Sequence, residues 1–534
     1  MNFLLTHLPV LPIVLPLIAG AGMLLLGDSH RQARTVVNLV ATFLLLVIAV
    51  ALLGQVNGDA SVRSLTYLPA NWPPPFGIVL VADRLSVLML ILVAVLGMAA
   101  LVASLTRWDR IGVHFHPLLQ FQLLGLNGAF LTGDLFNLFV FFEILLASSY
   151  GLLLHGSGVA RVRAGLHYVA VNLVGAFLFL IGVSLVYGAV GTLNMADLAQ
   201  RLPGVAGAER SLFHAGAAVL GCAFLIKAAV WPLNFWLVGA YTSATPPVAA
   251  LFAIMTKVGI YAVLRMTSLL SGGDDGQVLA ADWLFGAGLL TLLLGSAGLL
   301  GSQELRRQAA YSVIVSSGTL LAAIGLASTA VLGSALYYLI ISTLAVSAFF
   351  MLIDLIERNK PFGANMLAIS LEAFGLDDPV DPDRPDEVVG VALPAVMAIL
   401  GVGFVACALL ITGLPPLSGF IAKFGMLSSA LQGGQGAGVD IPVSGWLMLA
   451  AMLFSGLAGV LALARSGMRT FWAVERNVLR LRLLDALPVF TLLAICVALT
   501  IWAEPVLAYL NDTARALHTP QLYIDAVLSQ GEAR

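Results

Sequence analysis

Charged residues are scarce in this sequence, and their scarcity indicates the class of protein. Of the 534 residues, 10% are charged and 60% are hydrophobic, whereas a soluble domain is about 25% charged. A single water-soluble core stops growing at roughly 250–300 residues, so it could not hide this much apolar surface. Runs of about 20 apolar residues recur along nearly the whole chain, and each can cross a bilayer as a helix. The sequence predicts an all-α membrane protein.

Cysteines and cofactor motifs are also few. Cys222, Cys407 and Cys496 stand singly in apolar runs without CxxC spacing, which favours buried thiols over a metal site or disulfides. The sequence has no phosphate-binding glycine loop, haem attachment signal or cluster of metal ligands. Its net charge of -2 gives no electrostatic basis for binding nucleic acid. We therefore expect no cofactor, no metal ion and no nucleic-acid partner.

The apolar runs predict about fourteen membrane spans, two of them interrupted by proline. The predicted spans cover residues 4–26, 34–55, 78–105, 115–132, 134–155, 162–189, 212–240, 247–270, 282–302, 308–327, 332–356, 390–431, 444–465 and 483–509. Proline removes a backbone donor and clashes with the preceding turn. Pro232 in the seventh span, and Pro415 with Pro416 in the twelfth, therefore predict broken helices. Such breaks survive in a membrane only where protein or a wet cavity satisfies the freed backbone groups.

The two predicted breaks lie five spans apart, which suggests an internal repeat. We expect residues 1–110 to hold helices 1–3, 111–272 a first five-helix repeat, 273–466 a second, and 467–534 the last helix and a tail. Because five is odd, the second repeat would be inverted relative to the first. Inverted repeats with discontinuous helices at the ion site are common in transporters.

Basic residues in the loops predict the orientation of the chain. If the N-terminus is outside, the inner loops hold Arg31, Arg34, Arg107, Arg110, Arg161, Arg163, Arg306, Arg307, Arg358, Lys360, Arg384, Arg465, Arg469, Arg476, Arg480 and Arg482. The outer side then holds Arg63, Arg84, Arg201, Arg210, Arg265, Arg515 and Arg534. This bias predicts an even number of spans with both termini outside. The longest hydrophilic loop, residues 357–389, is acidic and rich in proline; it favours a solvated linker over a calcium loop, since it lacks the glycine and terminal glutamate of an EF-hand.

Four ionisable residues stand deep in apolar spans: Glu143, Lys227, Lys257 and Lys423. One charge at a helix centre costs roughly 2.5–3.5 kcal/mol on insertion scales. Chance is therefore a poor explanation for four such residues in one chain. Two interpretations remain open. The residues form buried pairs that only hold helices together, or they form a proton relay through the membrane interior.

The chemistry of a buried lysine favours the relay. Desolvation and a nearby carboxylate act in opposite directions on an amine's affinity for its proton. A movement of Glu143 toward or away from Lys227 would therefore change proton loading. The energies involved are comparable with the roughly 2.3 kcal/mol per charge that 100 mV of membrane potential supplies.

Four other polar residues are weaker candidates. Asp134 precedes Glu143 by nine residues and is interpreted either as part of a vestibule or as a helix cap. His167 is either a relay member or a core histidine. Ser316 and Ser317 belong to a hydroxyl-bearing stripe in the tenth span, which either holds water or serves helix packing.

Several segments resemble one known family, the antiporter-like proteins shared by Mrp-type cation/proton antiporters and respiratory complex I. The resemblance is carried by DLFNLFVFFEILLASSY at 134–150, LIKAAVWPLNFW at 225–236, TPPVAA at 245–250, TKVGIYA at 256–262, RQAAYSV at 307–313 and GLPPLSGFIAKF at 413–424. These motifs occur in the family's order across residues 70–480. Within the family the chain is most similar to the D-type subunits of the Mrp, or Pha, complex.

The resemblance implies a fold and a function. It implies a fourteen-helix core with an inverted repeat, and a proton path through Glu143, Lys227, Lys257 and Lys423. It also implies partners, namely A-, B-, C-, E-, F- and G-type subunits in a bacterial cytoplasmic membrane, and exchange of protons for Na⁺ or K⁺ without enzyme activity. The alternative is a proton-pumping subunit of a complex I-type redox complex. One departure stands out, because some relatives have a histidine in span ten where this chain has serines.

Overall fold

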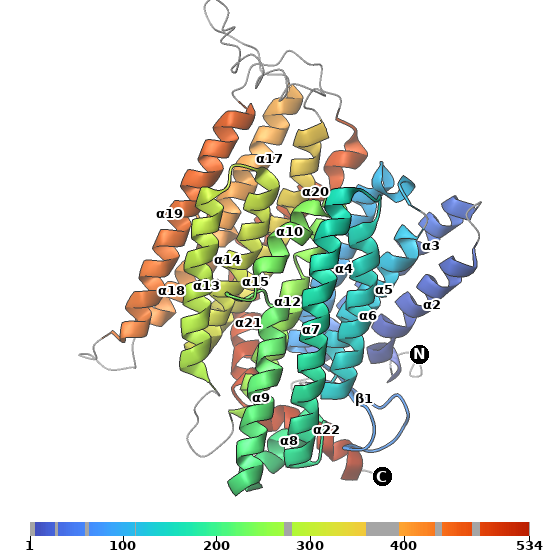
Figure 1. Cartoon of the computed structure of the whole chain (residues 1–534), viewed down its shortest axis with the longest axis vertical. Coiled ribbons are helices and arrows are strands. Elements are labelled where there is room, and N and C mark those ends of the chain that lie inside the picture. The colour runs from blue at the N-terminus through green and yellow to red at the C-terminus, as the bar shows by residue number, and fades with distance from the viewer. Residues whose placement is uncertain are drawn as a thin grey trace, which may run out of the picture.

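The chain folds into an upright bundle of long helices (Figure 1). The computed structural model describes residues 6–26, 30–58, 64–112, 114–271, 280–358, 395–432, 441–471 and 481–532. Its one described sheet is an unpredicted hairpin, in which β1 (Ser64–Tyr67) pairs antiparallel with β2 (Leu80–Asp83). The predicted all-α membrane fold is confirmed. Most of the predicted 357–389 loop lies outside the described residues.

The helices fall into two groups along the chain. The first comprises α2 (Leu11–Leu25), α3 (Arg31–Gly58), α4 (Arg84–Leu105), α5 (Phe115–Leu131), α6 (Leu135–Leu154), α7 (Val159–Val190), α8 (Met195–Arg201), α9 (Gly207–Lys227), α10 (Phe235–Ser243), α11 (Pro246–Phe252) and α12 (Met255–Leu270). The second comprises α13 (Ala281–Gly301), α14 (Leu305–Gly325), α15 (Thr329–Arg358), α17 (Ala395–Thr412), α18 (Ser418–Leu431), α19 (Val443–Phe471), α20 (Leu483–Ile501), α21 (Ala503–Leu517) and α22 (Pro520–Glu532). Three 3₁₀ turns, η1 (Leu8–Val10), η3 (Trp108–Arg110) and η4 (Leu202–Gly204), complete the described elements.

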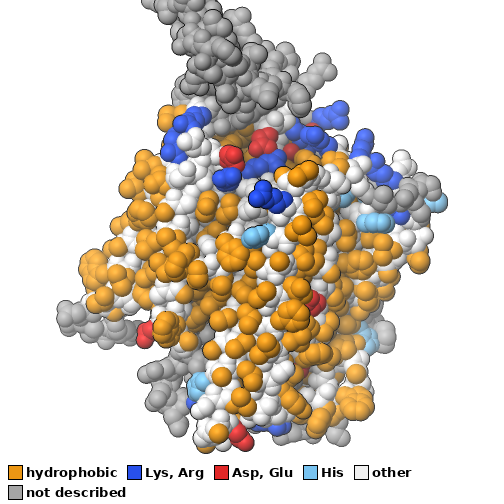
Figure 2. Space-filling view, in the orientation of Figure 1, with side chains coloured by type: hydrophobic (Ala, Val, Ile, Leu, Met, Phe, Trp, Pro, Cys, Tyr) orange, Lys and Arg blue, Asp and Glu red, His pale blue; other side chains and the backbone are white. Residues whose placement is uncertain are grey.

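Thirteen spans in the described part of the chain are long and apolar enough to cross a membrane. The one predicted span outside this set, 115–132, corresponds to α5, whose 17 residues are at the lower limit for crossing a bilayer. The flank of the bundle in Figure 2 is almost entirely hydrophobic, and basic side chains gather at the upper end. This is the surface expected where lipid replaces water around the helices.

Three interruptions divide predicted spans into separate helices. Between α9 and α10 the chain leaves the helix at 228–234, a segment that contains Pro232. Between α17 and α18 it does so at 413–417, which contains Pro415 and Pro416. A third interruption, which was not predicted from the sequence, separates α11 from α12 at 253–254.

Close packing of α13 on α14 shows how the bundle excludes voids. A Cβ added to Gly288 would lie 2.3 Å from the backbone N of Ala322, and one added to Gly318 would lie 2.5 Å from that of Leu292. Glycine at both positions lets the two backbones approach directly, as is typical of membrane helices. Further inside, α12, α14 and α15 are buried along most of their length. The centre of the bundle is therefore built from helices that have little contact with lipid.

The two ends of the bundle differ in charge. At one end, here called the arginine end, Arg31 pairs with Asp109 at 2.6 Å and Arg358 pairs with Asp485 at 2.7 Å. Arg306 pairs there with Glu357 at 2.5 Å. At the opposite end, here called the terminal end, lie the hairpin, α8, α21 and α22 (Figure 1). The predicted last span, 483–509, was wrong in extent, because α20 ends at Ile501 and the polar α21 and α22 follow.

Candidate functional site: four ionisable residues inside the bundle

Glu143 lies in the middle of α6 and is half-buried. Its Oε1 atom is buried, and it has no hydrogen-bond partner among the described residues. Its charge is close enough to interact with that of Lys227 on α9, although no ion pair within 4 Å joins the two among the described residues. A buried carboxylate oxygen without a partner is costly. Glu143 is therefore placed to gain a partner, a proton or a water molecule.

Lys227 is the last residue of α9, at the first interruption, and is buried. Its amine donates to Oδ1 of Asn172 at 3.0 Å rather than to Glu143. Asn172 in turn donates to the carbonyl of Tyr168 at 2.8 Å, and the Tyr168 hydroxyl lies 2.9 Å from Oγ of Ser149 on α6. The carboxyl end of a helix attracts a cation. The amine thus has a neutral anchor on α7 and a carboxylate within electrostatic reach.

Lys257 lies in the first turn of α12, directly after the interruption at 253–254, and is 1% exposed. Its amine donates to Oγ of Ser316 on α14 at 2.9 Å, with a longer contact to Oγ1 of Thr256. Ser316 lies 2.8 Å from Oγ of Ser342 on α15. The described residues offer this amine only neutral oxygens at hydrogen-bond distance. Of the two predicted serines, Ser316 therefore contacts a predicted relay lysine directly.

Lys423 lies on α18, beyond the interruption at 413–417, and is buried. Its amine donates to the carbonyl of Thr412 at 2.7 Å and more weakly to that of Ile411 at 3.4 Å. These carbonyls end α17, where the last turn of a helix leaves its acceptors without intrahelical partners. Lys423 therefore caps one half of a discontinuous helix from the other half.

Together the four residues share a local arrangement but not a continuous contact. Each lysine stands beside a point where a helix stops or starts, where free backbone groups and a helix dipole are available. The structure brings Glu143 near Lys227, and Lys257 onto Ser316. Within the described ranges, no direct hydrogen bond joins Lys227 to Lys257, or Lys257 to Lys423. Among those residues there is also no group of three or more His, Cys, Asp or Glu that could hold a metal ion.

Similarity to known proteins identifies the family. The family described as NADH:quinone oxidoreductase/Mrp antiporter, TM, matches residues 132–449, which hold all four ionisable residues. The sequence is 48% identical to that of the D-type subunit of a probable K(+)/H(+) antiporter from Rhizobium meliloti, over 99% of each chain.

The chain belongs to the NADH:quinone oxidoreductase/Mrp antiporter family. It is also 29% identical to the D-type subunit of the Na(+)/H(+) antiporter of Alkalihalophilus pseudofirmus, over 98% of this chain and 100% of the relative. Its fold is similar to that of a chain in the Mrp complex from Dietzia sp., with a TM-score of 0.81, 26% identity and coverage of 98% of this chain and 99% of that one. The predicted resemblance is confirmed, and a multi-pass membrane protein of a bacterial antiporter family is established.

The weaker candidates predicted from the sequence differ in their surroundings. Asp134 is the N-cap of α6, where its Oδ1 accepts from the backbone N–H of Asn137 at 2.9 Å, and burial raises its pKa. His167 is exposed on α7, its ring edge-on to Phe235, so its predicted place in the interior was wrong. Ser317 is buried, and its Oγ lacks a partner among the described residues. The expected burial of the cysteines holds for two, while Cys222 is exposed on α9.

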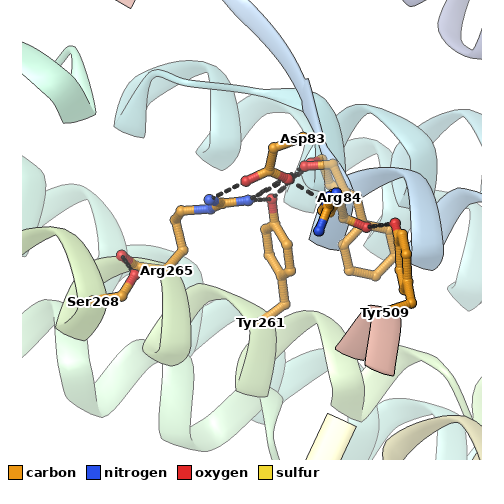
Figure 3. Close-up of polar contacts among 8 residues, drawn as sticks. Asp83, Arg84, Tyr261, Arg265, Ser268 and Tyr509 are labelled. Carbon is orange, nitrogen blue, oxygen red and sulfur yellow. Dashed lines mark hydrogen bonds and ion pairs between the residues drawn. The ribbon is translucent and has the colours of Figure 1, made fainter. Parts of the chain in front are cut away.

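One buried ion pair at the terminal end was missed by sequence reasoning. Arg265, counted above as an outer-loop residue, lies within α12 and binds both oxygens of Asp83, at 2.6 and 2.9 Å (Figure 3). The same guanidinium contacts the hydroxyl of Tyr261 at 3.0 Å, and Asp83 caps α4 through the N–H of Ser86. Although burial acts to raise it, Arg265 holds the pKa of Asp83 below its ordinary value. The signal was available, because Arg265 follows Lys257 by eight residues on the same helix.

The C-terminal helices cover this ion pair. The Tyr523 ring on α22 lies 5.1 Å from the Arg265 guanidinium, and Tyr509 on α21 donates to the carbonyl of Arg84 at 2.9 Å (Figure 3). A cavity of about 480 Å³ opens between these helices and α12. The cluster thus fastens α21 and α22 to the membrane-spanning helices at the terminal end.

Proposed function

We propose that this chain is the proton-conducting D-type subunit of a multisubunit monovalent cation/proton antiporter. The observation that carries the proposal is the set of three buried lysines, each beside a helix interruption, with one half-buried carboxylate near the first. Glu143, Lys227, Lys257 and Lys423 would load and release protons in turn. Ionisable residues inside membrane helices are costly and typically mark ion pathways.

The arrangement of Glu143 and Lys227 supports a switch rather than a fixed pair. A permanent ion pair would place the amine on the carboxylate, but here the amine is held by Asn172 at 3.0 Å. The side chain of lysine has a long flexible stem. A swing from Asn172 to Glu143 would exchange a neutral partner for a charged one, and so change how firmly the proton is held.

We also propose the wider setting of the chain. The other subunits would be of the A, B, C, E, F and G types, in a bacterial cytoplasmic membrane. The arginine end would face the cytoplasm, because basic residues favour that side, and both termini would lie outside. Residues 111–272 and 273–466 would form the two inverted repeats, the first with the interruptions at 228–234 and 253–254 and the second with the interruption at 413–417. The similarity to the K(+)/H(+) antiporter chain of Rhizobium meliloti favours K⁺ as the first cation to test.

Transport by everted membrane vesicles tests the proposal. Vesicles that contain the complete complex are acidified by respiration, and K⁺ or Na⁺ is added while the internal pH is followed by dye fluorescence. We expect either ion to release the acidification, and vesicles that lack this chain to show no release. If neither cation releases it, the antiporter function is contradicted. Mass spectrometry of the purified complex gives a second test, since peripheral flavin or iron–sulfur subunits would assign the chain to a redox complex instead.

A further inference from the structure

Two neighbouring helices at the centre of the bundle present hydroxyl groups to each other. Ser316 and Thr319 lie on α14, and Ser342 and Tyr338 lie on α15. All four residues are buried, with exposures of 1% to 5%. Their spacing of three or four residues places each pair on one face of its helix. The amine of Lys257 enters this arrangement at Ser316.

The hydrogen bonds near Lys257 can all be oriented with the donor on the side of the amine and the acceptor farther from it. Its amine donates to Ser316 at 2.9 Å, Ser316 shares a hydrogen bond of 2.8 Å with Ser342, and Ser342 donates to the carbonyl of Leu339 at 3.3 Å. An ammonium has donors only, whereas a hydroxyl both donates and accepts. Ser316 therefore accepts from Lys257 and can donate to Ser342, so that this chain of bonds leads away from the amine.

The hydroxyl groups that lead toward the terminal end start from Ser316 and not from Ser342. The Tyr338 hydroxyl, one turn nearer the start of α15 than Ser342, is close to those of Ser316 and Thr319. Ser334 follows one turn nearer the start of α15, and its Oγ lies against Gly425 of α18. Ser316 is nine residues from the end of α14, which is roughly 14 Å of helix.

At the terminal end, α21 packs against the start of α15, where this row of hydroxyl groups ends. The carboxamide of Asn511 lies against Gly333 at the start of α15, and Asn511 itself is partly exposed. Because Arg306 at the start of α14 pairs with Glu357 near the end of α15, the turn that joins the two helices must lie away from the arginine end. The path from Lys257 therefore leads toward the end that carries the termini.

We propose that Ser316 and Tyr338 form a proton exit from Lys257 toward the terminal end, with Ser342 as the second hydrogen-bond partner that orients Ser316, separate from any transfer between Lys257 and Lys423. The proposal rests on the proton-conducting function proposed above. In each step an N–H or O–H bond breaks and an O–H bond forms on the next oxygen. The last hydroxyl passes its proton to a water molecule near Ser334, and the hydroxyls then rotate back. No atom is consumed, and one positive charge moves.

A packing role alone does not account for this pattern. In membrane helices, the hydroxyl groups of serine and threonine commonly donate a hydrogen bond to the backbone carbonyl one turn earlier. Ser312 does so to Gln308 and Thr343 to Leu339. Ser316 instead accepts a hydrogen bond from a buried amine on another helix and contacts a second hydroxyl. Ser312 and Thr343 are therefore matched controls, buried to the same degree on the same two helices.

The experiment compares Ser342→Ala, Ser342→Thr, Tyr338→Phe, Ser312→Ala and Thr343→Val in everted vesicles with equal amounts of assembled complex. We expect Ser342→Ala and Tyr338→Phe to slow cation-driven proton release about tenfold and to raise its solvent isotope effect, since a proton step becomes limiting. Ser342→Thr keeps the hydroxyl and should restore most of the rate. The two control variants should transport at the wild-type rate.

Three outcomes would overturn the proposed exit path. Wild-type rates in both Ser342→Ala and Tyr338→Phe would overturn the exit path while leaving the antiporter function intact. Equal losses in the control variants would show that any change of packing slows transport, and would also overturn it. An absence of cation-driven release in the wild type would contradict the proposed function itself, and the exit path with it.

Discussion

The two halves of the bundle surround their lysines differently. In the first half, Lys227 has an amide partner on α7 and a carboxylate within electrostatic reach on α6. In the second half, Lys423 has only backbone carbonyls at the end of α17, and Lys257, between the halves, has only hydroxyls. Among the described residues, a carboxylate inside the spans thus accompanies the first lysine and neither of the other two.

This difference suggests different roles along one path. An amine that can choose between a neutral amide and a carboxylate has two states that differ in charge environment. An amine held by carbonyls or hydroxyls has one set of partners and no comparable alternative in the described structure. We therefore interpret Glu143 and Lys227 as the part that switches, and Lys257 with Lys423 as the part that passes protons on.

The largest expected effect is that of Lys227→Met, which keeps the length of the side chain but removes the amine. It should lower cation-driven proton release by about a hundredfold or more, as is usual for loss of a group that transfers protons. The complex should still assemble, with a lower melting temperature, because Oδ1 of the buried Asn172 loses its partner at a cost of about 1–3 kcal/mol. Cys222→Ala, on the exposed face of the same helix, should transport normally. Normal release by Lys227→Met would disprove the switch.

Lys423→Met should reduce both transport and assembly. Besides its proposed proton transfer, Lys423 satisfies the carbonyls of Thr412 and Ile411, and a buried acceptor left unpaired costs about 1–3 kcal/mol. We expect a lower melting temperature of the purified complex as well as slower proton release. Phe424→Ala, at the neighbouring exposed position, is the control. A fall in transport with an unchanged melting temperature would contradict the structural role of Lys423, which would then serve transport alone.

Asn172→Ala should have an intermediate effect. It removes the neutral anchor of Lys227 and leaves the amine within electrostatic reach of Glu143, so the amine should spend more time near the carboxylate. We expect roughly a tenfold slower release, equivalent to about 1.4 kcal/mol, and a shifted pH profile of transport. Leu173→Ala, exposed on the same helix, should do neither. An unchanged pH profile would argue that the anchor plays no part in switching.

Asp83→Asn should affect stability far more than transport. The carboxylate binds Arg265, whose side chain is 4% exposed, and loss of one partner of a buried pair costs roughly 3–5 kcal/mol. Because the pKa of Asp83 lies below its ordinary 3.8, this stabilisation is complete at neutral pH and is lost as the pH falls through the folded-state pKa. Thermal melting of the purified complex measures the loss. Asp512→Asn, which breaks a half-exposed pair with Arg84, should cost under about 1 kcal/mol, and equal melting of the two variants would contradict the assignment.

Much of the fold could be predicted, because hydropathy and proline are strong signals in a membrane chain. The interruptions at Pro232 and at Pro415 lie where the sequence predicted breaks. The interruption before Lys257 has no proline inside it and left no comparable signal. The first half of the polar helix α21 was interpreted as a continuation of the last span, and the rest of α21 with α22 as a tail. Only the spacing of polar residues in α21 distinguishes it from that span.

The site was predicted by residue type but not by contact. Glu143 and the three lysines stand out against an apolar background, so composition alone identifies them. Their partners do not, because Asn172, Ser316 and Ser342 are ordinary residues until neighbouring helices bring them to an amine. The prediction for His167 was wrong because residue type does not show which way a side chain faces, and this histidine faces outward from α7.

The most direct test of the account is Glu143→Gln, measured as cation-driven proton release in everted vesicles with the assembled complex quantified in the same membranes. Val140→Ala, about one turn earlier on α6 and exposed, serves as the control. We expect Glu143→Gln to assemble normally with cation-driven proton release nearly abolished, and Val140→Ala to release protons at the normal rate. Normal release per assembled complex from Glu143→Gln, or loss of assembly in place of loss of transport, would show that the buried charges only hold the helices together.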